Sequence, residues 1–525
     1  MCGIIGGIGI KDIARVLYTG LKDGLQHRGQ ESAGILTYDK ESYHLMREQG
    51  LVEEAIPKST GLLGETGLGQ VRYSTAGGLL HAQPILDGGI GIVHNGNLVN
   101  YDRLREYANQ SGIDIGLDEN PSDTQLFGRM LASSKQSDLT DAILEALKEV
   151  KPTYSMLIQY KDTLYAVRDR TGNRPLYLGK LNGGYIFASE ERALRSLGAE
   201  NIKEVPAGKL VKIEKKDSES YEFTEVQFAQ PVYRRCQVEP IYLANAGIEE
   251  EVSPKIFDMD IRLGRIAAGA ILASKNTAQG DIIVPTMNSG YYSAVGYSSE
   301  SGLNYDQTIL EKDPKYGKRN FIDPDTNRRI WGWKRVFRPN AADIVGKKLL
   351  VTEDTIVRGD TQAGTVQLAR VHGAREYHAK IASAPLLHAC HMGINFPTQE
   401  ELIAWQMQQR MGDNFIGGIE NFLRLRFFGL EYPKSQLVEM AASIPPTEQA
   451  IIGVVEKSTR EDKNYVSRES PRPSKKDHVI TDPEDFNPQR VTLDFLTLAE
   501  QRAAYETWDG YCDACWTGDY SGFFD

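Results

Sequence analysis

The chain has 525 residues, of which 41% are hydrophobic, and 71 acidic side chains outnumber 60 basic ones to give a net charge of -11. Because a single hydrophobic core usually stops growing at roughly 250 to 300 residues, we expect two or more domains, and the acidic balance offers no basic stripe for a nucleic acid. No apolar run approaches the ~20 residues that span a bilayer and the first residues lack a secretory signal, so we expect a cytoplasmic protein whose cysteines are catalytic or metal-binding rather than disulfide-bonded.

The first stretch places a cysteine directly behind the initiator methionine, in the order Met1-Cys2-Gly3-Ile4-Ile5-Gly6-Gly7. If Met1 is removed, Cys2 carries both a thiol and a free α-amine. The reference pKa of that amine is roughly 7.7 to 8, so it can take the thiol proton directly or through one water. Nucleophile and base would then be one residue. The alternative interpretation is a small apolar residue at the start of a strand.

Four further motifs follow Cys2 in order along the chain. They are Gln26-His27-Arg28-Gly29-Gln30-Glu31-Ser32-Ala33-Gly34-Ile35, then Gly69-Gln70-Val71-Arg72-Tyr73-Ser74-Thr75-Ala76-Gly77, then His94-Asn95-Gly96-Asn97-Leu98, then Ser122-Asp123-Thr124. Together they resemble the glutamine-hydrolysing domain of the class II amidotransferases. The resemblance implies an N-terminal-nucleophile (Ntn hydrolase) fold, an αββα sandwich of two sheets between helices.

The resemblance also assigns roles in binding and hydrolysing glutamine. Arg72 pairs with the substrate carboxylate in the fork geometry of a guanidinium, and Asp123 receives the substrate ammonium. Asn95, through its amide, and Gly96, through its backbone N–H, donate to the tetrahedral oxyanion. Each residue also has a purely structural interpretation: a surface ion pair for Arg72, a hairpin turn for Asn95 and Gly96, and a helix N-terminal charge for Asp123.

Hydrophobic spacing after Asp123 predicts two helices, one through Leu126, Met130 and Leu131 and one through Ile143, Leu144 and Leu147. Residues 154–158 and 164–168 are typical of paired strands, and residues 185–190 complete the strand pattern of the sandwich. We expect this domain to cover residues 2–230.

From about residue 241 the pattern becomes apolar strand, glycine-containing turn and helix, which favours a doubly wound parallel sheet. One unit has a strand at 281–285, the turn Asn288-Ser289-Gly290 and a helix with Ala294 and Val295. A second has a buried strand at 348–351, a loop at 352–361 and a helix at 366–371 that Gly373 ends.

The loop of the second unit resembles the phosphoribosyl pyrophosphate loop of type I phosphoribosyltransferases, and its residues are Glu353-Asp354-Thr355-Ile356-Val357-Arg358-Gly359-Asp360-Thr361. Two acidic residues at a strand end can accept hydrogen bonds from ribose hydroxyls. The following backbone N–H groups, at a helix N-terminus, can surround a 5-phosphate. For an isolated acidic pair, the alternative would be an acidic loop that caps a helix.

Over nearly its whole length the chain resembles the amidophosphoribosyltransferase family, with a divergent phosphoribosyl site. The resemblance implies a glycosyltransferase that hydrolyses glutamine, channels the ammonia to phosphoribosyl pyrophosphate and forms 5-phosphoribosylamine, glutamate and pyrophosphate, the first step of purine synthesis. It further implies Mg2+ held by Ser289, Glu353 and Asp354, and a loop at 312–321 that closes over the substrate. Possible feedback nucleotides and a homo-oligomer, specifically a tetramer, are also implied. The phosphoribosyltransferase-like domain is expected at 231–445, and an extended tail at 446–525, with an exposed linker in 460–488.

Four cysteines remain after Cys2, namely Cys236, Cys390, Cys512 and Cys515. A single Cys-x-x-Cys is common to zinc ribbons, redox sites and clusters. All four fall where one branch of the family places the thiolates of a [4Fe-4S] cluster, and such a cluster would be structural. Structural zinc and buried free cysteines are the alternatives.

Two other functions stay open. The glutaminase could aminate a different activated phosphosugar, because Met287-Asn288-Ser289 and Asp360 depart from the usual family sequence. The chain could also be a regulatory paralogue that binds a nucleotide and no longer transfers, although an intact glutaminase set argues against this.

Overall fold

The computed structural model describes twelve ranges of the chain. They are residues 2–58, 61–73, 81–113, 121–217, 220–247, 254–275, 279–312, 337–396, 398–427, 434–443, 490–507 and 509–523. Residues 74–77 of the second motif, 313–321 of the expected closing loop and the whole expected linker at 460–488 lie outside these ranges.

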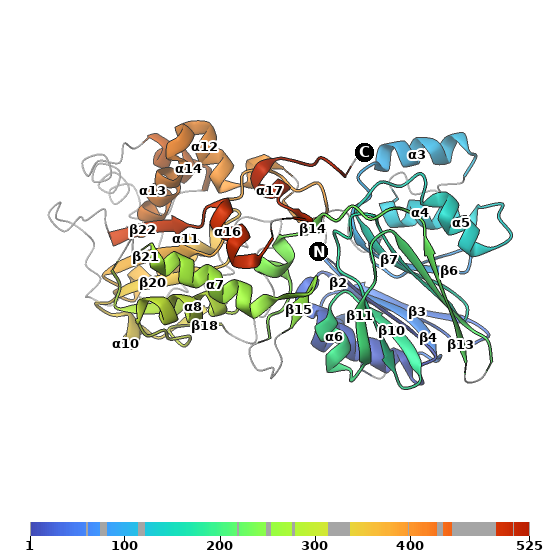
Figure 1. The fold of residues 1–525 in the computed structure, drawn as a ribbon. Coiled ribbons are helices and arrows are strands. Elements are labelled where there is room, and N and C mark those ends of the chain that lie inside the picture. Colours follow the sequence, from blue (N-terminus) through green and yellow to red (C-terminus); the bar gives the residue numbers. More distant parts are fainter. Residues whose placement is uncertain are drawn as a thin grey trace, which may run out of the picture.

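Two antiparallel sheets form the amino-terminal half (Figure 1). The seven-stranded sheet has the order β11 (Glu200–Glu204), β9 (Tyr177–Leu181), β10 (Gly184–Ala188), β1 (Gly3–Ile8), β4 (Thr66–Arg72), β2 (Ser32–Tyr38) and β3 (Tyr43–Gln49). The six-stranded sheet has the order β13 (Tyr221–Gln227), β12 (Lys209–Lys215), β8 (Thr163–Arg168), β7 (Tyr154–Tyr160), β6 (Ile90–Gly96) and β5 (Ile85–Asp87).

Alternating side chains divide this half into four layers. Ile4, Leu68, Val93 and Leu157 belong to one buried cluster between the two sheets. Because successive residues of a strand face opposite sides, the neighbours of these residues face outward and pack against the helices. α1 (Ile13–Thr19) and α6 (Glu191–Ser196) cover the first sheet, and the second is covered by α3 (Tyr101–Gln110), α4 (Asp123–Ala132) and α5 (Leu139–Ala146). The expected αββα sandwich is confirmed.

The carboxy-terminal half contains a four-stranded sheet in which all three pairings are parallel. Its order is β17 (Ile282–Pro285), β20 (Lys348–Glu353), β21 (Glu376–Ile381) and β22 (Val491–Phe495). Helices cover both faces, as expected for a doubly wound sheet. One face carries α11 (Asp360–Val371), α12 (Ile403–Met411), α13 (Phe415–Phe427) and α14 (Lys434–Ser443), and the other carries α7 (Ile261–Ser274), α8 (Tyr291–Ser301) and α16 (Leu498–Tyr505).

Short elements join the two halves and flank the parallel sheet. β14 (Arg235–Cys236) pairs in parallel with β23 (Tyr511–Cys512), so the segment after the sandwich lies beside the far end of the chain, next to α17 (Ala514–Thr517). The remaining elements include α2 (Val52–Ala55), the hairpin of β15 (Lys255–Ile256) and β16 (Met259–Asp260), the pair β18 (Leu310–Lys312) and β19 (Phe337–Pro339), and α10 (Ala341–Ile344).

The predicted elements are found with small shifts at their ends. α11 starts at Asp360 rather than at residue 366, because Gly359 takes a φ of 78° at its N-cap and lets the helix begin directly after the loop. β22 was not predicted, since it lies in the expected tail at 446–525, in which the sequence analysis predicts no strand. Among the described residues, no helix is both long and apolar enough to cross a membrane.

Candidate functional site

The residues predicted to bind and hydrolyse glutamine all lie at the ends of elements. Cys2 directly precedes β1, Arg72 is the last residue of β4, Asn95 and Gly96 end β6, and Asp123 is the first residue of α4. The three strand ends belong to two different sheets, so only the fold brings them to one place.

Register explains how Cys2 and Arg72 come to face the same way. In the β1–β4 pair, Ile4 lies opposite Gln70 and Gly3 opposite Val71. The next step along the register places Cys2 opposite Arg72. Ile4 belongs to the core between the sheets, and side chains two residues apart on a strand face the same side. Cys2, two residues before Ile4, and Arg72, two residues after Gln70, are therefore directed to the same interface.

Asn95 approaches the same interface from the second sheet. It lies two residues beyond Val93, which packs in the core between the sheets. The two strand ends are also tied together: the Gln70 side chain donates to the His94 carbonyl at 2.8 Å, and Gln83 Oε1 accepts from Gln70 and from the His94 amide. The thiol, the guanidinium and the amide therefore share one end of the sandwich.

The turn at Asn95 and Gly96 has the features of an oxyanion site. Asn95 is fully buried, and neither its amide nitrogen nor its amide oxygen has a hydrogen-bond partner in the part of the chain that the structure describes. A buried amide without partners costs free energy, which a ligand oxygen can recover. Asn97 and Thr153 exchange both backbone hydrogen bonds, so the neighbouring Gly96 N–H points away from β7.

Gly96 needs to be glycine for two reasons. Its φ is 154°, and an added Cβ would lie 2.1 Å from the Thr153 carbonyl oxygen. This tight contact holds the backbone of Gly96 against β7 and so fixes the position of its N–H group.

Asp123 contacts residues on both sides of Asn95 and Gly96. It accepts from the Leu98 amide at 3.1 Å, and its carboxylate lies 3.6 Å from Nδ1 of His94. Ser122 and Gln125 form a capping box that starts α4 at Asp123. Burial lowers the pKa of His94 although the Asp123 charge opposes this, so the imidazole is neutral at physiological pH.

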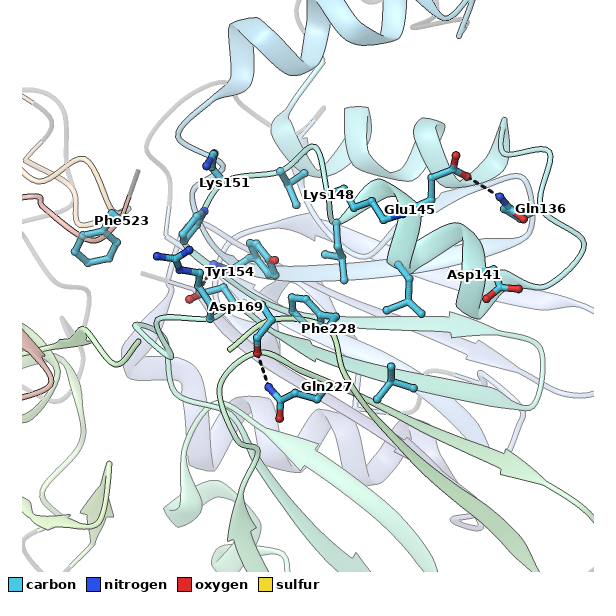
Figure 2. A pocket seen from close by; sticks show the side chains of 17 residues that line it. Gln136, Asp141, Glu145, Lys148, Lys151, Tyr154, Asp169, Gln227, Phe228 and Phe523 are labelled. Atoms are coloured by element: carbon cyan, nitrogen blue, oxygen red, sulfur yellow. Dashed lines mark hydrogen bonds between the residues drawn. The ribbon is translucent and has the colours of Figure 1, made fainter. Parts of the chain in front are cut away.

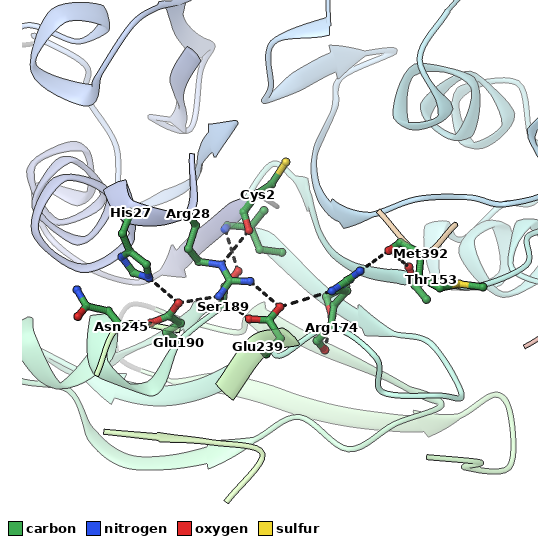
Figure 3. A network of polar contacts seen from close by, with 12 residues as sticks. Cys2, His27, Arg28, Thr153, Arg174, Ser189, Glu190, Glu239, Asn245 and Met392 are labelled. Carbon is green, nitrogen blue, oxygen red and sulfur yellow. Dashed lines mark hydrogen bonds and ion pairs between the residues drawn. The ribbon is translucent and has the colours of Figure 1, made fainter. Parts of the chain in front are cut away.

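A buried charge network surrounds the backbone of Cys2 (Figure 3). Arg28 Nε donates to the Cys2 carbonyl at 3.0 Å, and the rest of its guanidinium binds Glu190 at 2.6 Å and Glu239 at 2.8 and 2.9 Å. His27 also binds Glu190, at 2.7 Å. Burial opposes charge here, but His27 and Arg28 outweigh it and lower the pKa of Glu190 to about 2.

The same network continues into the second half of the chain. Glu239 follows β14, and its carboxylate lies 3.6 Å from Arg174, whose guanidinium donates to the Met392 carbonyl. Sequence reasoning assigned no function to Arg28, Arg174, Glu190 or Glu239. The only signals were that Arg28 stands within the motif at 26–35 and that Glu190 ends the strand pattern at 185–190.

The second candidate site lies at the carboxyl end of β20. Glu353 and Asp354 are buried there, and Ser289 donates to Glu353 at 2.7 Å, so the structure brings these three predicted residues together. Gln362 of α11 donates to the other oxygen of Glu353 at 3.3 Å. Burial, reinforced by the Asp354 charge, raises the pKa of Glu353 to about 8.

The rest of the predicted phosphoribosyl loop joins β20 to α11. Ile356 is buried, and the buried Thr355 hydroxyl has no hydrogen-bond partner among the described residues. Asp360 and the exposed Thr361 open α11, where backbone N–H groups can receive a phosphate. Arg358 is paired with Glu401, with its Nε at 2.8 Å, and donates to the Asn395 carbonyl at 3.1 Å.

The four remaining cysteines gather in one buried cluster, although they come from three distant segments. Cys236 pairs with Cys512 across β14 and β23, and the Cys515 thiol hydrogen-bonds to Cys390. That hydrogen bond lowers the pKa of Cys390, whereas burial raises the pKa of Cys236 to about 11.

As a donor set, four thiols in an apolar surrounding suit an iron–sulfur cluster or a tetrahedral zinc ion. The charge of Arg174 acts on Cys236 and Cys390 and would compensate thiolates. Among the described residues, no group of three or more His, Cys, Asp or Glu side chains is arranged to hold a metal ion. The four thiols therefore fit such a group by their donor chemistry and not by their arrangement.

A pocket of 610 Å³ lies elsewhere on the sandwich, between α5 and the edge formed by β13 (Figure 2). Lys148, Lys151, Tyr154 and Asp169 line it, and Phe523 closes one side. None of the predicted site residues lines this pocket, so we assign it no part in glutamine hydrolysis or in binding at the end of β20.

Comparison with known proteins gives one family match and many relatives. A family model described as a glutamine amidotransferase domain matches residues 71–196. The chloroplastic amidophosphoribosyltransferase 1 of Arabidopsis thaliana is 35% identical over 428 residues, covering 79% of this chain and 72% of that protein. The amidophosphoribosyltransferase of Methanocaldococcus jannaschii is 34% identical over 427 residues, covering 77% of this chain and 88% of that protein.

A solved structure is similar over almost the full length. The glutamine phosphoribosylpyrophosphate amidotransferase of B. subtilis, in complex with ADP and GMP, superimposes with a TM-score of 0.73 at 26% identity and covers 99% of this chain and 97% of that one. The likeness therefore includes both the sandwich and the parallel sheet.

Proposed function

Because the chain belongs to the amidophosphoribosyltransferase family, we propose which of its residues carry each step of the family's reaction. The protein is a glutamine-hydrolysing phosphoribosyl transferase that catalyses the glutamine-dependent first step of purine synthesis. The observation that carries the residue assignment is the convergence of Cys2, Arg72 and the unpartnered amide of Asn95 at one end of the sandwich.

In the glutamine half, Cys2 is the nucleophile once Met1 has been removed. Its α-amine takes the thiol proton, and Sγ attacks the side-chain amide carbon of glutamine. Arg72 binds the substrate carboxylate and Asp123 its ammonium. The oxyanion accepts from Asn95 Nδ2 and the Gly96 N–H; the leaving nitrogen takes the proton from the α-amine and departs as ammonia, leaving a thioester that water hydrolyses to glutamate.

In the transfer half, the loop 353–361 holds phosphoribosyl pyrophosphate. Glu353 and Asp354 accept from the ribose hydroxyls, and the backbone of Ile356, Val357, Arg358 and Gly359, together with Thr355, Asp360 and Thr361, surrounds the 5-phosphate. Ammonia, channelled inside the protein, attacks C1 of the ribose, and the C1–O bond to pyrophosphate breaks. The product is 5-phosphoribosylamine.

Two metal groups belong to this proposal. Cys236, Cys390, Cys512 and Cys515 would hold a structural [4Fe-4S] cluster, and the chain would then belong to the iron–sulfur branch of the family. The common burial of the four cysteines and the charge of Arg174 support this. Ser289, Glu353 and Asp354 would bind Mg2+, which neutralises pyrophosphate charge when bound. The contact between Ser289 and Glu353 supports that assignment.

The proposal extends to organisation and control. We assign residues 2–230 to the glutaminase domain, 231–445 to the phosphoribosyltransferase-like domain and 446–525 to the tail that carries the last two cysteines. The B. subtilis enzyme was solved with ADP and GMP, which supports feedback by purine nucleotides here. A homo-tetramer and a cytoplasmic location stay predictions.

The decisive experiment is the Cys2→Ser variant assayed with two nitrogen sources. Glutamate release from glutamine should be lost, and phosphoribosylamine formation from added ammonia should remain, because the second site does not use the thiol. Loss of both activities would contradict two separate sites. If the wild-type enzyme releases glutamate but forms no phosphoribosylamine, a different activated phosphosugar becomes the acceptor to test.

A further inference from the structure

One segment of the second half, residues 390–403, contacts both candidate sites. It begins at Cys390 and ends where α12 starts. The hydrogen bond from the Cys390 amide to the Phe396 carbonyl, at 3.0 Å, closes its first part into a compact loop. We call residues 390–396 and 398–403 the bridging segment.

The amino-terminal part of the bridging segment lies against the turn that ends β6. Nδ2 of Asn97 donates to the His391 carbonyl at 2.9 Å, and the Thr153 hydroxyl donates to the Met392 carbonyl at 3.0 Å. Asn97 and Thr153 are the last pair of the β6–β7 ladder. Both of these side chains therefore hold a second-half carbonyl directly beside the proposed oxyanion donors.

A glycine makes this approach possible. Gly393 has a φ of 100°, and an added Cβ would lie 3.2 Å from the carbonyl carbon and oxygen of Gly96. The backbone of Gly393 thus rests on the peptide group that follows Gly96. A side chain at residue 393 would press on the turn whose N–H is proposed to bind the oxyanion.

The other end of the bridging segment holds the phosphoribosyl loop. The Asn395 carbonyl and the Glu401 carboxylate both accept from Arg358, and the Ile403 amide donates to the Val357 carbonyl at 2.9 Å. The contacts at the two ends come from one short stretch of chain.

We propose that the bridging segment positions the oxyanion turn, with Asn97 and Thr153 as the positioning residues that bind its carbonyl groups. This inference rests on the proposed function of Asn95 and Gly96. Asn95 and Gly96 are the last two residues of β6, and directly after this end of the ladder the side chains of Asn97 and Thr153 bind the carbonyls of His391 and Met392. Donors that stabilise an oxyanion must stay within a fraction of an ångström of their working position, because a displacement of about 1 Å can cost about a hundredfold in rate.

The test compares four variants of the full-length protein. Thr153→Val removes the hydroxyl from a fully buried site at nearly constant volume, and Thr153→Ser keeps it. Asn97→Ala removes the bond to His391. The matched control is Asn100→Ala, because in the described contacts the Asn100 side chain bonds only to Glu149 and Lys151 of the sandwich itself. For each variant we would measure kcat and KM for glutamine hydrolysis, ammonia-dependent product formation and the thermal midpoint.

A positioning role predicts a selective loss in kcat. Thr153→Val and Asn97→Ala should each lower kcat for glutamine by about tenfold with KM changed by less than about twofold, since the oxyanion exists only in the transition state. Thr153→Ser should recover most of the rate, and ammonia-dependent activity should stay unchanged.

Other outcomes have separate meanings. If kcat of both variants stays within about twofold of wild type, or if only the thermal midpoint falls, the positioning role is wrong while the proposed function stands. If Asn100→Ala loses as much kcat as Asn97→Ala, the contacts to the bridging segment are not special and the inference also fails. If wild-type protein releases no glutamate from glutamine, the proposed function itself fails.

Discussion

Arg28 and Glu239 form a two-pronged ion pair, with nitrogen-to-oxygen distances of 2.8 and 2.9 Å, although 211 positions separate them in the chain. Both side chains are fully buried. The third nitrogen of the same guanidinium binds the Cys2 carbonyl. The position of the proposed nucleophile therefore depends on a carboxylate that lies beyond the last strand of the sandwich.

Replacing Glu239 by Gln should destabilise the protein strongly. The change leaves a buried guanidinium with one carboxylate instead of two, and breaking a buried ion pair typically costs 3–5 kcal/mol, so we expect a loss of about 3 kcal/mol. Denaturant unfolding measures it. Glu191→Gln is the matched control, because its pair with Arg195 is an i,i+4 contact in which Arg195 is exposed, and it should change stability by less than about 0.5 kcal/mol. Equal effects of the two changes would contradict this account.

Asn95→Ala should reduce glutamine hydrolysis without unfolding the sandwich. Removing one oxyanion donor typically lowers kcat by about a hundredfold or more, and KM should change little. Steady-state kinetics with glutamine give both values, and ammonia-dependent activity serves as an internal reference. Asn109→Ala, on the exposed face of α3, should behave as wild type. A rise in KM at constant kcat would show instead that Asn95 binds the ground-state substrate.

Sequence patterns were sufficient for the residues whose role is encoded locally. The apolar runs at 154–158 and 164–168, and the motif at Ser122, predicted β7, β8 and the start of α4 correctly. Cys2, Arg72 and Asn95 could be named from their motifs. That they share one end of the sandwich follows only from strand register and from the facing of two sheets, which short-range patterns do not contain.

Residues that are partners in the fold but far apart in the sequence could not be predicted, for a physical reason. Nothing near Arg28 in sequence marks Glu239 as its partner, because an ion pair needs complementary charge and proximity but no spacing rule. β22 was missed because its strand completes a sheet that starts some two hundred residues earlier, and its pairing with β21 rests on tertiary contacts rather than on turn signals.

Protein purified without oxygen from iron-replete cells should contain about four iron atoms and a similar amount of sulfide per chain. Cys512→Ser should lose this iron and expose the C-terminal segment to protease, because the cluster would no longer link β14 to the end of the chain. Cys2→Ser should keep it and is the control. Zinc in place of iron would favour the tetrahedral zinc alternative, and absence of both metals would leave four buried thiols.

Acid should destabilise the fold through His94. Its pKa is lowered in the folded state by burial, so below the unfolded value of about 6.5 the unfolded chain binds a proton that the folded chain does not. Stability should therefore be independent of this group above pH ~6.5 and fall by up to about 1.4 kcal/mol per pH unit below it. Asp123 and Asp169 oppose the shift and Arg174 adds to it, so the slope reflects their sum.

The measurement compares unfolding free energies of wild type and His94→Gln between pH 5 and 8, a range that brackets the reference pKa of about 6.5. The variant cannot titrate at this position, so its curve should be flatter on the acid side. Parallel curves would mean that His94 is protonated equally in both states.

The contacts that complete the glutaminase site also set an order for its maturation during synthesis. Domains generally fold from the amino terminus as the chain leaves the ribosome. The strands of the sandwich are all translated by Gln227, yet at that moment Arg28 has Glu190 but not Glu239 as a carboxylate partner, and the turn at Gly96 lacks its contacts to the second half. Only when Glu239, and later Gly393, have emerged can the nascent site take its final form. A ribosome-bound chain that ends between these two residues should therefore carry a folded sandwich with an unfinished nucleophile site, so the cell would make an active glutaminase only together with the half that consumes its ammonia.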